Sequence, residues 1–363
     1  MSAGDGVRRQ VARAWLRPLV PVYGLVTGLK RRLAWWGLLR ERWLASPVIS
    51  VGSVSAGGAG KTPVVILLTQ LLAKRGYAVR ILTRGYGRRS SGVERVNPGG
   101  DANWYGDEPV LMAQRTGLET DAAVFVGADR YAAGLLAEHE PIEGKVLVHV
   151  LDDGFQHRKL GRDVDVVLVT RQDLEDTLLP AGNLRESLEA LRYADVIVVR
   201  EEESAWVEEV VGRLMAKEGL PGGEVAEIWR IRRRLSFGEG SGVRLERPVV
   251  FSGIARPEGL VQMLAGEGWV AAERVVFADH HAYVEGDMTR LVEVARRVGA
   301  DGFVTTEKDA VKLTAAMWAR LEEVGPVMVA RLEVELAEEK AKLDRMISQV
   351  KAMDRRRHKK TWR

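Results

Sequence analysis

Residues 48–70 read V-I-S-V-G-S-V-S-A-G-G-A-G-K-T-P-V-V-I-L-L-T-Q, and this segment sets the architecture of the rest of the chain. It opens with four largely apolar residues, as a buried parallel strand does. Glycines then allow the backbone to turn tightly and to bring its N–H groups close to a ligand. Lys61 and Thr62 open an apolar run, 64–72, with the length and leucine content of a helix. This order of strand, glycine loop, Lys-Thr and helix is typical of a phosphate-binding loop.

The usual form of such a loop is G-x-x-x-x-G-K-[ST], and Ser55 stands where the first glycine belongs. We expect Lys61 to reach the terminal phosphates of a nucleotide and Thr62 to hold Mg²⁺. The alternative is a glycine-rich turn before an ordinary helix. The predicted nucleotide-binding residues are Ser55, Ala56, Gly57, Gly58, Ala59, Gly60, Lys61 and Thr62.

Composition limits the class of protein. At 363 residues, the chain is long enough for two domains. Its 46% hydrophobic and 29% charged residues are typical of a globular protein. The absence of cysteine excludes disulfides, a cysteine-ligated zinc and a thiol nucleophile, and it fits a cytosolic setting. The 54 Lys and Arg against 50 Asp and Glu leave a mildly basic net charge of +4.

Residues 8–43 interleave basic side chains with tryptophan and leucine, a pattern that suits a helix lying on a membrane surface but does not by itself decide for one. The alternative is two amphipathic helices packed on the protein's own core, with a solvated basic face. We find no secretory signal, and the best candidate for a membrane span, 18–29, is bracketed by charges and holds prolines and glycines. The basic residues are Arg8, Arg9, Arg13, Arg17, Lys30, Arg31, Arg32, Arg40 and Arg42.

The remainder of the chain alternates strand and helix patterns, which predicts an α/β fold with a doubly wound parallel sheet of the P-loop NTPase type. A second, smaller α/β domain follows. We expect strands at 77–83, 122–126, 146–151, 164–170, 195–200, 229–235, 248–253, within 301–313 and at 327–332, and the motif V-V-F-A-D-H-H-A-Y occupies 275–283. We expect helices at 201–224, 257–266, 287–298 and 333–353, a mobile loop at 88–103 and a disordered tail at 355–360.

The expected domain boundaries follow from these elements. They are amphipathic membrane-associating helices at 1–45, a kinase-type P-loop domain at 46–228, connecting strands at 229–246, the smaller domain at 247–332, a C-terminal helix at 333–353 and a basic tail at 354–363.

Several polar residues stand at strand or loop ends, where ligands bind in open α/β sheets. Asp152 and Asp153 end an apolar strand, as the carboxylates of a Walker-B metal site do. Two adjacent carboxylates are costly unless a cation compensates their charge, so we expect a metal here. Arg84 follows another strand, and a Pro-Gly loop delivers Arg185 and Glu186 together. Asp107, on a turn after the long loop, suits either a helix cap or a general base. For the pair Asp152 and Asp153, the alternative to a metal site is a simple polar turn.

Nine motifs in order resemble one family. They are S-A-G-G-A-G-K-T-P, T-R-G-Y-G, G-D-E-P, A-D-R, D-D-G-F-Q-H, L-L-P-A-G-N-L-R-E, F-S-G-I-A-R-P, F-A-D-H-H and T-T-E-K-D-A-V-K-L. Their sequence is similar to that of the tetraacyldisaccharide 4′-kinases, the lipid A 4′-kinases of Gram-negative bacteria, from about Pro21 to about Leu313. D-D-G-F-Q-H and L-P-A-G-x-L-R-E are the most specific, and the family also tends to carry a hydroxyl residue at the position of Ser55.

The resemblance implies MgATP-dependent transfer of the γ-phosphate to the 4′-hydroxyl of a tetraacylated glucosamine disaccharide 1-phosphate. It implies contact with the cytoplasmic face of the inner membrane as a peripheral or monotopic protein, and we expect a monomer that binds no nucleic acid. The implied catalytic base is Asp107, assisted by His280, with His281 the alternative. The implied metal residues are Thr62, Asp152, Asp153, Gln156 and Glu186, and the implied phosphate or substrate contacts are Arg84, Arg130 and Arg185.

Because His280 lies in the second α/β unit and Asp107 in the first, we expect a cleft between domains that closes in turnover. The alternative function is a partition-type ATPase on a membrane, but Ala56 replaces the signature lysine of that class. A GTPase is disfavoured because 306–309 reads T-E-K-D rather than T-K-x-D. A membrane scaffold would not need Lys61 and two aspartates around one site, and no aromatic-bearing nucleic-acid module is visible.

Overall fold

The computed structural model describes residues 14–36, 41–58, 60–117, 120–142, 144–216, 226–237 and 244–361. The predictions for Ala59, for residues 1–13 with Arg8, Arg9 and Arg13, and for residues 37–40 with Arg40 lie outside these residues. The strands are β1 Val48–Ser53, β2 Tyr77–Thr83, β3 Glu94–Arg95, β4 Ala122–Val126, β5 Val146–Asp152, β6 Val164–Leu168, β7 Val196–Arg200, β8 Glu227–Phe237, β9 Val249–Ser252, β10 Glu273–Val276, β11 Phe303–Thr306 and β12 Val327–Leu336.

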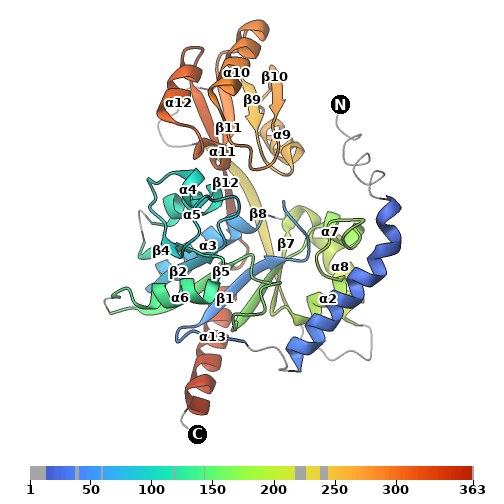
Figure 1. Cartoon of the computed structure of the whole chain (residues 1–363). Helices are drawn as coiled ribbons and strands as arrows, with labels where there is room; N and C mark the ends of the chain where they lie inside the picture. Colours follow the sequence, from blue (N-terminus) through green and yellow to red (C-terminus); the bar gives the residue numbers. More distant parts are fainter. Residues whose placement is uncertain are drawn as a thin grey trace.

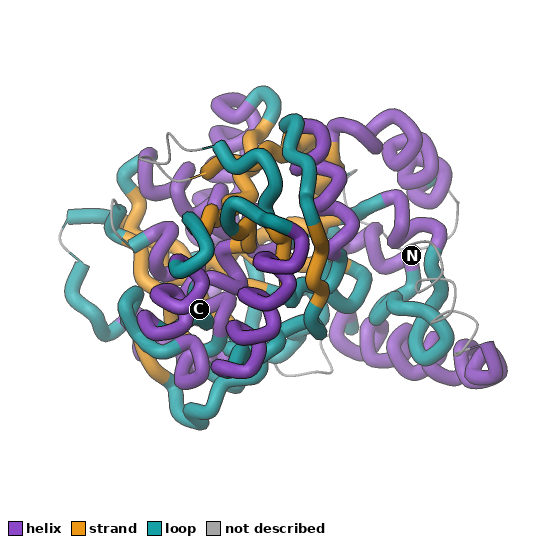
Figure 2. Tube along the Cα trace, turned by 90° about the horizontal axis from the view of Figure 1, so that it is seen from above, coloured by secondary structure: helices purple, strands orange, loops and turns teal. Residues whose placement is uncertain are grey.

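Helices flank these strands on both faces (Figures 1 and 2). They are α2 Val20–Trp35, α3 Lys61–Lys74, α4 Ala102–Tyr105, α5 Asp107–Thr116, α6 Arg130–Glu138, α7 Arg171–Glu175, α8 Ser204–Met215, α9 Pro257–Gly266, α10 Glu285–Val298, α11 Glu307–Ala310, α12 Ala315–Glu322 and α13 Glu339–Thr361. Short 3₁₀ helices occur at η1 Ala14–Leu19, η2 Leu188–Tyr193 and η3 Glu201–Glu203.

The described strands form a single sheet in the order β10-β9-β11-β12-β8-β7-β6-β1-β5-β2-β4-β3. Pairing is parallel except for β8 with β12 and β3 with β4. The half around β1 is called the large lobe here, and the half formed by β9–β11 with α9–α12 the small lobe. In Figure 1, β8 and β12 run between the two lobes. The strands of the second α/β unit therefore continue the hydrogen-bonded sheet of the first.

Side chains alternate between two buried faces along the large-lobe strands, which is why these strands are apolar throughout. Val51, Ile81 and Val150 pack against α3, α5 and α13, whereas Leu82 and Leu151 pack on the opposite face with α6. The same layering recurs in the small lobe, with α10 and α12 on one face and α9 on the other. The carboxyl ends of β1, β2 and β5 therefore meet at one edge of the sheet, where the predicted site residues follow them.

Strand and helix positions agree with the sequence prediction in most of the chain, but the C-terminal third differs. Residues 333–336, expected to begin a helix, extend β12, because this strand finds a long antiparallel partner in β8. The helix begins only at Glu339, and the tail expected to be disordered belongs to it as far as Thr361. A helix anchored by buried residues in its first half propagates at low cost beyond them.

Two other expected segments also differ. The loop 88–103 contains β3, which pairs with β4, and ends in α4, so part of it is held against the sheet edge. The expected helix 201–224 consists of η3 followed by α8, which ends at Met215, and its predicted end lies outside the described residues. The helix α12 was not predicted.

The N-terminal helix α2 turns its apolar side outward. Its protein-facing positions follow helical spacing and include small and polar residues: Val20, Tyr23, Gly24, Thr27 and Arg31. Tyr23 donates a hydrogen bond to the carbonyl of Arg185 (3.2 Å), and Gly24 lets the helix approach Leu178. Large apolar side chains point away from the protein, namely Trp15, Leu19, Val22, Leu25, Val26, Leu29 and Trp36. No helix of the described chain has the length and apolar character needed to cross a membrane.

Candidate active site

The glycine loop connects β1 to α3 and ends in a left-handed residue. Gly60, which caps the N-terminus of α3, has φ 91° and ψ 30°, a conformation that glycine adopts without steric cost. Lys61 is the first residue of the helix, and its Nζ lies 3.2 Å from Ser53 Oγ and 3.3 Å from Asp153 Oδ1. Thr62 is half-buried in the first turn. The strand, loop and helix thus occupy the positions that the sequence predicted.

The L-L-P-A-G-N-L-R-E segment packs directly on this loop. The amide of Ala56 donates to the carbonyl of Asn183 (2.9 Å), and Ser55 pairs with Leu184 in an isolated β-bridge. Arg185 reaches across the loop, with Nε donating to the Ser55 carbonyl (3.1 Å) and both terminal nitrogens donating to Asp153 (2.7 and 2.9 Å). Two motifs 130 residues apart therefore form one wall.

Asp152 and Asp153 differ sharply in their surroundings. Asp152 is buried and accepts a hydrogen bond from Thr83 Oγ1 (2.8 Å). Burial, Glu108 and Asp153 together raise its pKa to about 7. Burial also disfavours the charge of Asp153, but the hydrogen bonds from Arg185 and the charge of Lys61 outweigh it and lower the pKa of that carboxyl well below its usual range. A cation near both carboxylates would lower the raised pKa of Asp152.

Two buried side-chain oxygens of these motifs have no hydrogen-bond partner among the described residues. Gln156 donates from Nε2 to the Ser53 carbonyl (2.8 Å), while its Oε1 has no partner among the described residues. The buried Ser55 Oγ is likewise unpaired there. Oxygen atoms of this kind are the ligands that Mg²⁺ prefers. No group of three or more His, Asp or Glu side chains gathers closely enough to hold a metal by itself in the part of the chain that the structure describes.

Glu186, expected in the metal site, is instead held by arginines. Arg31 of α2 lies 2.7 Å from Glu186 Oε2, Arg158 lies 3.4 Å from Oε1, and all but 8% of the Glu186 side chain is buried. Arg31 also stacks over Phe155 at 4.9 Å and donates to the Ala190 carbonyl. Arg31 was counted among the basic residues that face lipid, but it is buried inside the protein. The sequence offered no signal for this pairing, which spans 155 residues.

Replacing Arg31 with methionine is expected to lower the free energy of unfolding by up to about 3 kcal/mol, because Glu186 then loses its nearest compensating charge. Removing Glu186 as well, in an Arg31→Met/Glu186→Gln variant, should recover part of the loss. Urea denaturation followed by tryptophan fluorescence measures both. The matched control is Arg32→Met, at the neighbouring exposed arginine. Equal losses for Arg31→Met and Arg32→Met would contradict the expectation.

Asp107 and His280 meet where the lobes touch. His280 Nδ1 lies 2.9 Å from Asp107 Oδ2 and 3.1 Å from Oδ1, and the Asp107 side chain is 7% exposed. Asp107 begins α5 and also accepts the Glu108 amide (2.8 Å). Burial opposes its charge, but the hydrogen bond with His280 and the nearby Lys308 lower its pKa, so it is ionised at neutral pH. His281, the alternative partner, contacts Asp287 instead (2.9 Å).

Backbone strain marks two of these positions. Asp153 (φ 50°) and His280 (φ 58°) adopt the left-handed conformation, which among non-glycine residues of the described chain is shared only with Glu338. Such conformations persist where surrounding contacts hold them, and they concentrate at functional sites. Each residue is held by the contacts given above, so the strain orients both side chains.

Arg84, Arg130 and His157 lie together beside the aspartate pair. Arg130 is buried, donates to the Ala128 carbonyl (2.8 Å) and leaves Nε without a partner among the described residues. Burial and the charge of Arg84 lower the pKa of Arg130, and burial and Arg130 lower the pKa of His157 to about 4. An anion placed here would relieve this concentration of positive charge. His157 was not singled out from the sequence.

The small lobe also approaches the glycine loop. A Cβ atom on Gly58 would lie 2.6 Å from Nε of Arg256, so only glycine permits this contact. Arg256 follows β9, and its Nη2 lies 3.7 Å from Asp173 of the large lobe. Sequence analysis did not select Arg256, although it stands after a strand end, as Arg84 does. The loop and the small lobe are thus in contact in this structure.

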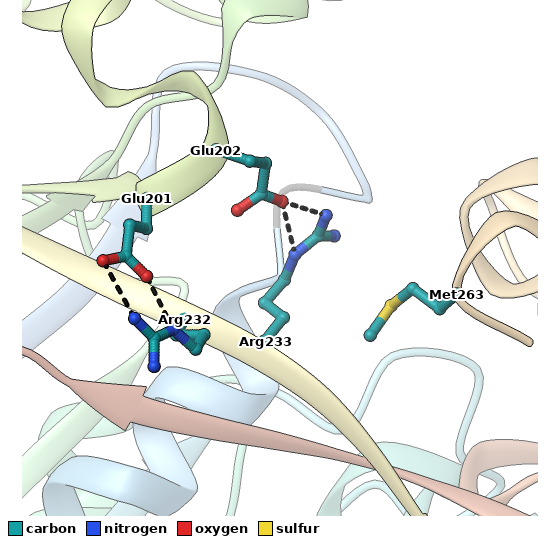
Figure 3. Close-up of a pocket in the computed structure, with 5 residues that line it drawn as sticks. All are labelled: Glu201, Glu202, Arg232, Arg233 and Met263. Carbon is teal, nitrogen blue, oxygen red and sulfur yellow. Dashed lines mark hydrogen bonds and ion pairs between the residues drawn. The ribbon is translucent and has the colours of Figure 1, made fainter. Parts of the chain in front are cut away.

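A pocket of about 370 Å³ lies elsewhere, on β8 between the lobes. Figure 3 shows its walls: Arg232 pairs with Glu201, Arg233 pairs with Glu202, and Met263 faces them from α9. None of the predicted site residues lines it. Its ion pairs are solvent-exposed and are therefore worth little individually.

Comparison with known proteins gives consistent matches. The family model described as Tetraacyldisaccharide-1-P 4′-kinase matches residues 12–351. A Koribacter versatilis protein named tetraacyldisaccharide 4′-kinase is 36% identical over 335 residues, covering 92% of this chain and 98% of that protein. One of the same name from Geobacter metallireducens is 38% identical over 343 residues, covering 90% and 95%. A crystal structure of LpxK from Aquifex aeolicus in complex with ATP superposes with a TM-score of 0.70 at 31% identity, covering 93% of this chain and 99% of that one.

Proposed function

The chain belongs to the tetraacyldisaccharide-1-P 4′-kinase family, and on that premise we propose the reaction and the residues that carry it out. The protein is a phosphotransferase that acts on a hydroxyl group, in the lipid A 4′-kinase role. It transfers the γ-phosphate of ATP to the 4′-hydroxyl of a tetraacyl disaccharide 1-phosphate. The observation that carries this assignment to particular residues is the convergence of Lys61, the aspartate pair and the Asp107–His280 contact at one edge of the sheet.

The fold that we propose for the large lobe is the P-loop NTPase type. It is supported by the strand, glycine loop and helix around Lys61 and by the aspartates that end the neighbouring strand β5. In this assignment, the loop amides and Lys61 bind the phosphates of ATP, and Arg185 supports them from the opposite wall. Phosphoryl transfer depends mainly on such positioning and on charge neutralisation.

Asp107 is the proposed base. It accepts the proton of the sugar hydroxyl as the oxygen attacks phosphorus, and the hydrogen bond from His280 holds its carboxylate in place. We propose that Arg84 and Arg130 bind an anionic group of the substrate. His157, which is neutral because burial and Arg130 lower its pKa, lies beside them. The exposed Tyr86, whose ring lies 5.3 Å from that of His280, stands at the entrance to this region.

The residues around Asp152 fit a magnesium ion. Asp152, Asp153, Gln156 and Thr62 would supply the oxygen atoms, and two oxygens, of Gln156 and Ser55, are unpartnered in the described chain. The pKa of Asp152 is raised first by burial and then by the charges of Glu108 and Asp153, which a cation would offset. When bound, Mg²⁺ supplies charge neutralisation of the phosphates. Glu186 is not part of this proposed set in the present arrangement, because Arg31 and Arg158 occupy it.

We propose that the outward face of α2 and η1 rests on the cytoplasmic face of the inner membrane. The proposal is supported by its exposed apolar side chains, with Leu25 at 74% and Trp15 at 75%, and by the exposed Arg17, Lys30 and Arg32 beside them. A soluble surface rarely leaves such a patch uncovered. We further propose a monomer with the expected domains up to residue 332, followed by the rest of β12 and the helix α13, and lobes that open and close at the Asp107–His280 contact.

A charge on this face should weaken membrane binding. Leu25→Glu is expected to lower partitioning onto phosphatidylglycerol vesicles by about tenfold or more, because it removes about 2 kcal/mol of apolar burial and adds repulsion. Co-sedimentation with vesicles measures it. The matched control is Val270→Glu, at an equally exposed apolar residue of the small lobe. Equal partitioning of the two variants would count against the proposed face.

The reaction itself is tested with γ-³²P-labelled ATP, Mg²⁺ and a tetraacyl disaccharide 1-phosphate in detergent micelles. Transfer of label to the lipid supports the proposal. Absence of labelled lipid together with steady ATP hydrolysis that vesicles stimulate would instead favour the alternative, a membrane-associated partition-type ATPase.

A further inference from the structure

Lys308, in the T-T-E-K-D motif, lies on the far side of the catalytic pair. It belongs to α11 of the small lobe, and its side chain is 17% exposed. Its Nζ lies 3.2 Å from each of three groups: His280 Nε2, Asp279 Oδ1 and Glu108 Oε1. An ammonium group has three N–H donors and no acceptor, so these three contacts use all of them. Lys308 therefore joins the two lobes around His280.

This contact determines which nitrogen of His280 carries a proton. Because Lys308 only donates, the hydrogen bond at Nε2 requires that nitrogen to be bare. The remaining proton then lies on Nδ1, which donates to Asp107. The imidazole is thus neutral when Nδ1 donates to Asp107 and Nε2 accepts from Lys308, and its orientation is fixed from both sides.

The charges around His280 act in opposite directions. The pKa of His280 is raised overall, because the hydrogen bond to Asp107 and the charges of Asp107 and Asp279 outweigh burial and the charge of Lys308, which lower it. Burial lowers the pKa of Lys308, but Glu108, Asp107 and Asp279 outweigh it and raise that pKa overall, so the amine stays cationic. Lys312, paired with Asp309, adds positive charge near Asp107. At Nε2, Lys308 (3.2 Å) opposes protonation of His280, whereas the more distant Asp279 Oδ2 (3.8 Å) favours it.

We propose that Lys308 is a positioning residue for the reaction: it holds His280 as the neutral Nδ1–H tautomer and thereby keeps Asp107 available as the base. The inference rests on the proposed function and deepens it. Neither nitrogen of His280 is free to take a proton in this arrangement, since Nδ1 already carries one and Nε2 faces an ammonium group. The substrate proton therefore stays on the Asp107 carboxylate and is not relayed to His280.

The first test is the pH dependence of phosphoryl transfer in Lys308→Met, at saturating Mg²⁺. Loss of the cation removes a contribution that lowers the pKa of His280, so the acidic limb of kcat should move to higher pH by about one unit. Activity should fall about tenfold at pH 7 and recover at pH 9, where His280 is neutral again. Lys308→Arg, which keeps the charge, should restore most of the wild-type profile.

Two matched controls separate positioning from general structural support. Arg115→Met removes another ion pair between the lobes, with Glu307 at 2.8 Å, without touching His280. Any loss it causes should be equal at all pH values. Lys145→Met removes an exposed lysine paired with Asp121 and should leave the pH profile unchanged. A loss in Lys308→Met that is also equal at every pH would overturn the proposal.

The second test observes the tautomer directly. Nitrogen-15 spectra of the histidine rings, assigned by comparison with His280→Gln, should show at pH 8 a protonated Nδ1 and a bare Nε2 at His280. In Lys308→Met, the ring should become doubly protonated at a higher pH than in the wild type. A protonated Nε2 in the wild type at pH 8 would overturn the inference even if the protein is an active lipid kinase, whereas an inactive wild type would overturn the proposed function itself.

Discussion

Replacing Asp107 with asparagine is expected to lower kcat for lipid phosphorylation by about 10²–10⁴-fold, the usual contribution of a positioned general base. The buried carboxylate, ionised at neutral pH, accepts hydrogen bonds from His280 and from the Glu108 amide. Asparagine keeps the shape and an acceptor for both donors but cannot take up the substrate proton. The measurement is transfer of γ-³²P from ATP to tetraacyl disaccharide 1-phosphate in micelles.

ATP affinity distinguishes a base from a structural residue at this position. Equilibrium dialysis with labelled ATP should give the same dissociation constant for Asp107→Asn and the wild type, because Asp107 begins α5 and its hydrogen bonds go to His280 and the Glu108 amide, not to the described residues of the glycine loop. If Asp107→Asn loses both ATP binding and phosphoryl transfer, Asp107 supports the fold and is not only a base. Asp107→Ala, which also removes the acceptor for the Glu108 amide, serves as the more disruptive comparison.

Lys61→Met is expected to lower kcat by about 10²–10³-fold, the cost of removing one preorganised charge from the transferring phosphoryl group. Lys61 is the cation that the glycine loop itself places, and its Nζ rests between Ser53 and Asp153. ATP affinity should fall as well, which distinguishes this variant from Asp107→Asn. The same transfer and dialysis experiments measure both quantities.

The matched control for this variant is Lys74→Met, at the exposed lysine that ends the same helix. It should leave transfer and ATP binding unchanged. Removing Lys61 also leaves Asp153 with Arg185 as its remaining ion-pair partner in the described chain, so the fold is expected to survive. Wild-type transfer by Lys61→Met would contradict the phosphate-binding role of the loop.

Local sequence patterns were sufficient for the elements that carry the site. The apolar run before the glycines gave β1, the Lys-Thr step gave the start of α3, and the paired aspartates fell at the end of β5. These features depend on neighbouring residues, whose spacing fixes their geometry. Strand β12 was misjudged because its charged second half is stable as a strand only when β8 pairs with it.

Contacts between distant segments were beyond the reach of local patterns. Glu186 carries no mark in the sequence that pairs it with Arg31, and this ion pair depends on the docking of α2. The choice between His280 and His281 was open in the sequence. In the structure, the ring of His280 contacts Asp107 and that of His281 contacts Asp287, which favours His280 as the assisting residue.

The sequence by itself determined the α/β alternation, the glycine loop, the family and most of the residues proposed for catalysis. Periodicity and short motifs encode these features within a few residues. The tertiary structure alone decided that two lobes share one sheet, that Arg31 is buried against Glu186, and that Lys308 completes the surroundings of His280. Such pairings join residues 28 to 155 positions apart, and their energy depends on burial and on exact partners that exist only once the chain has folded.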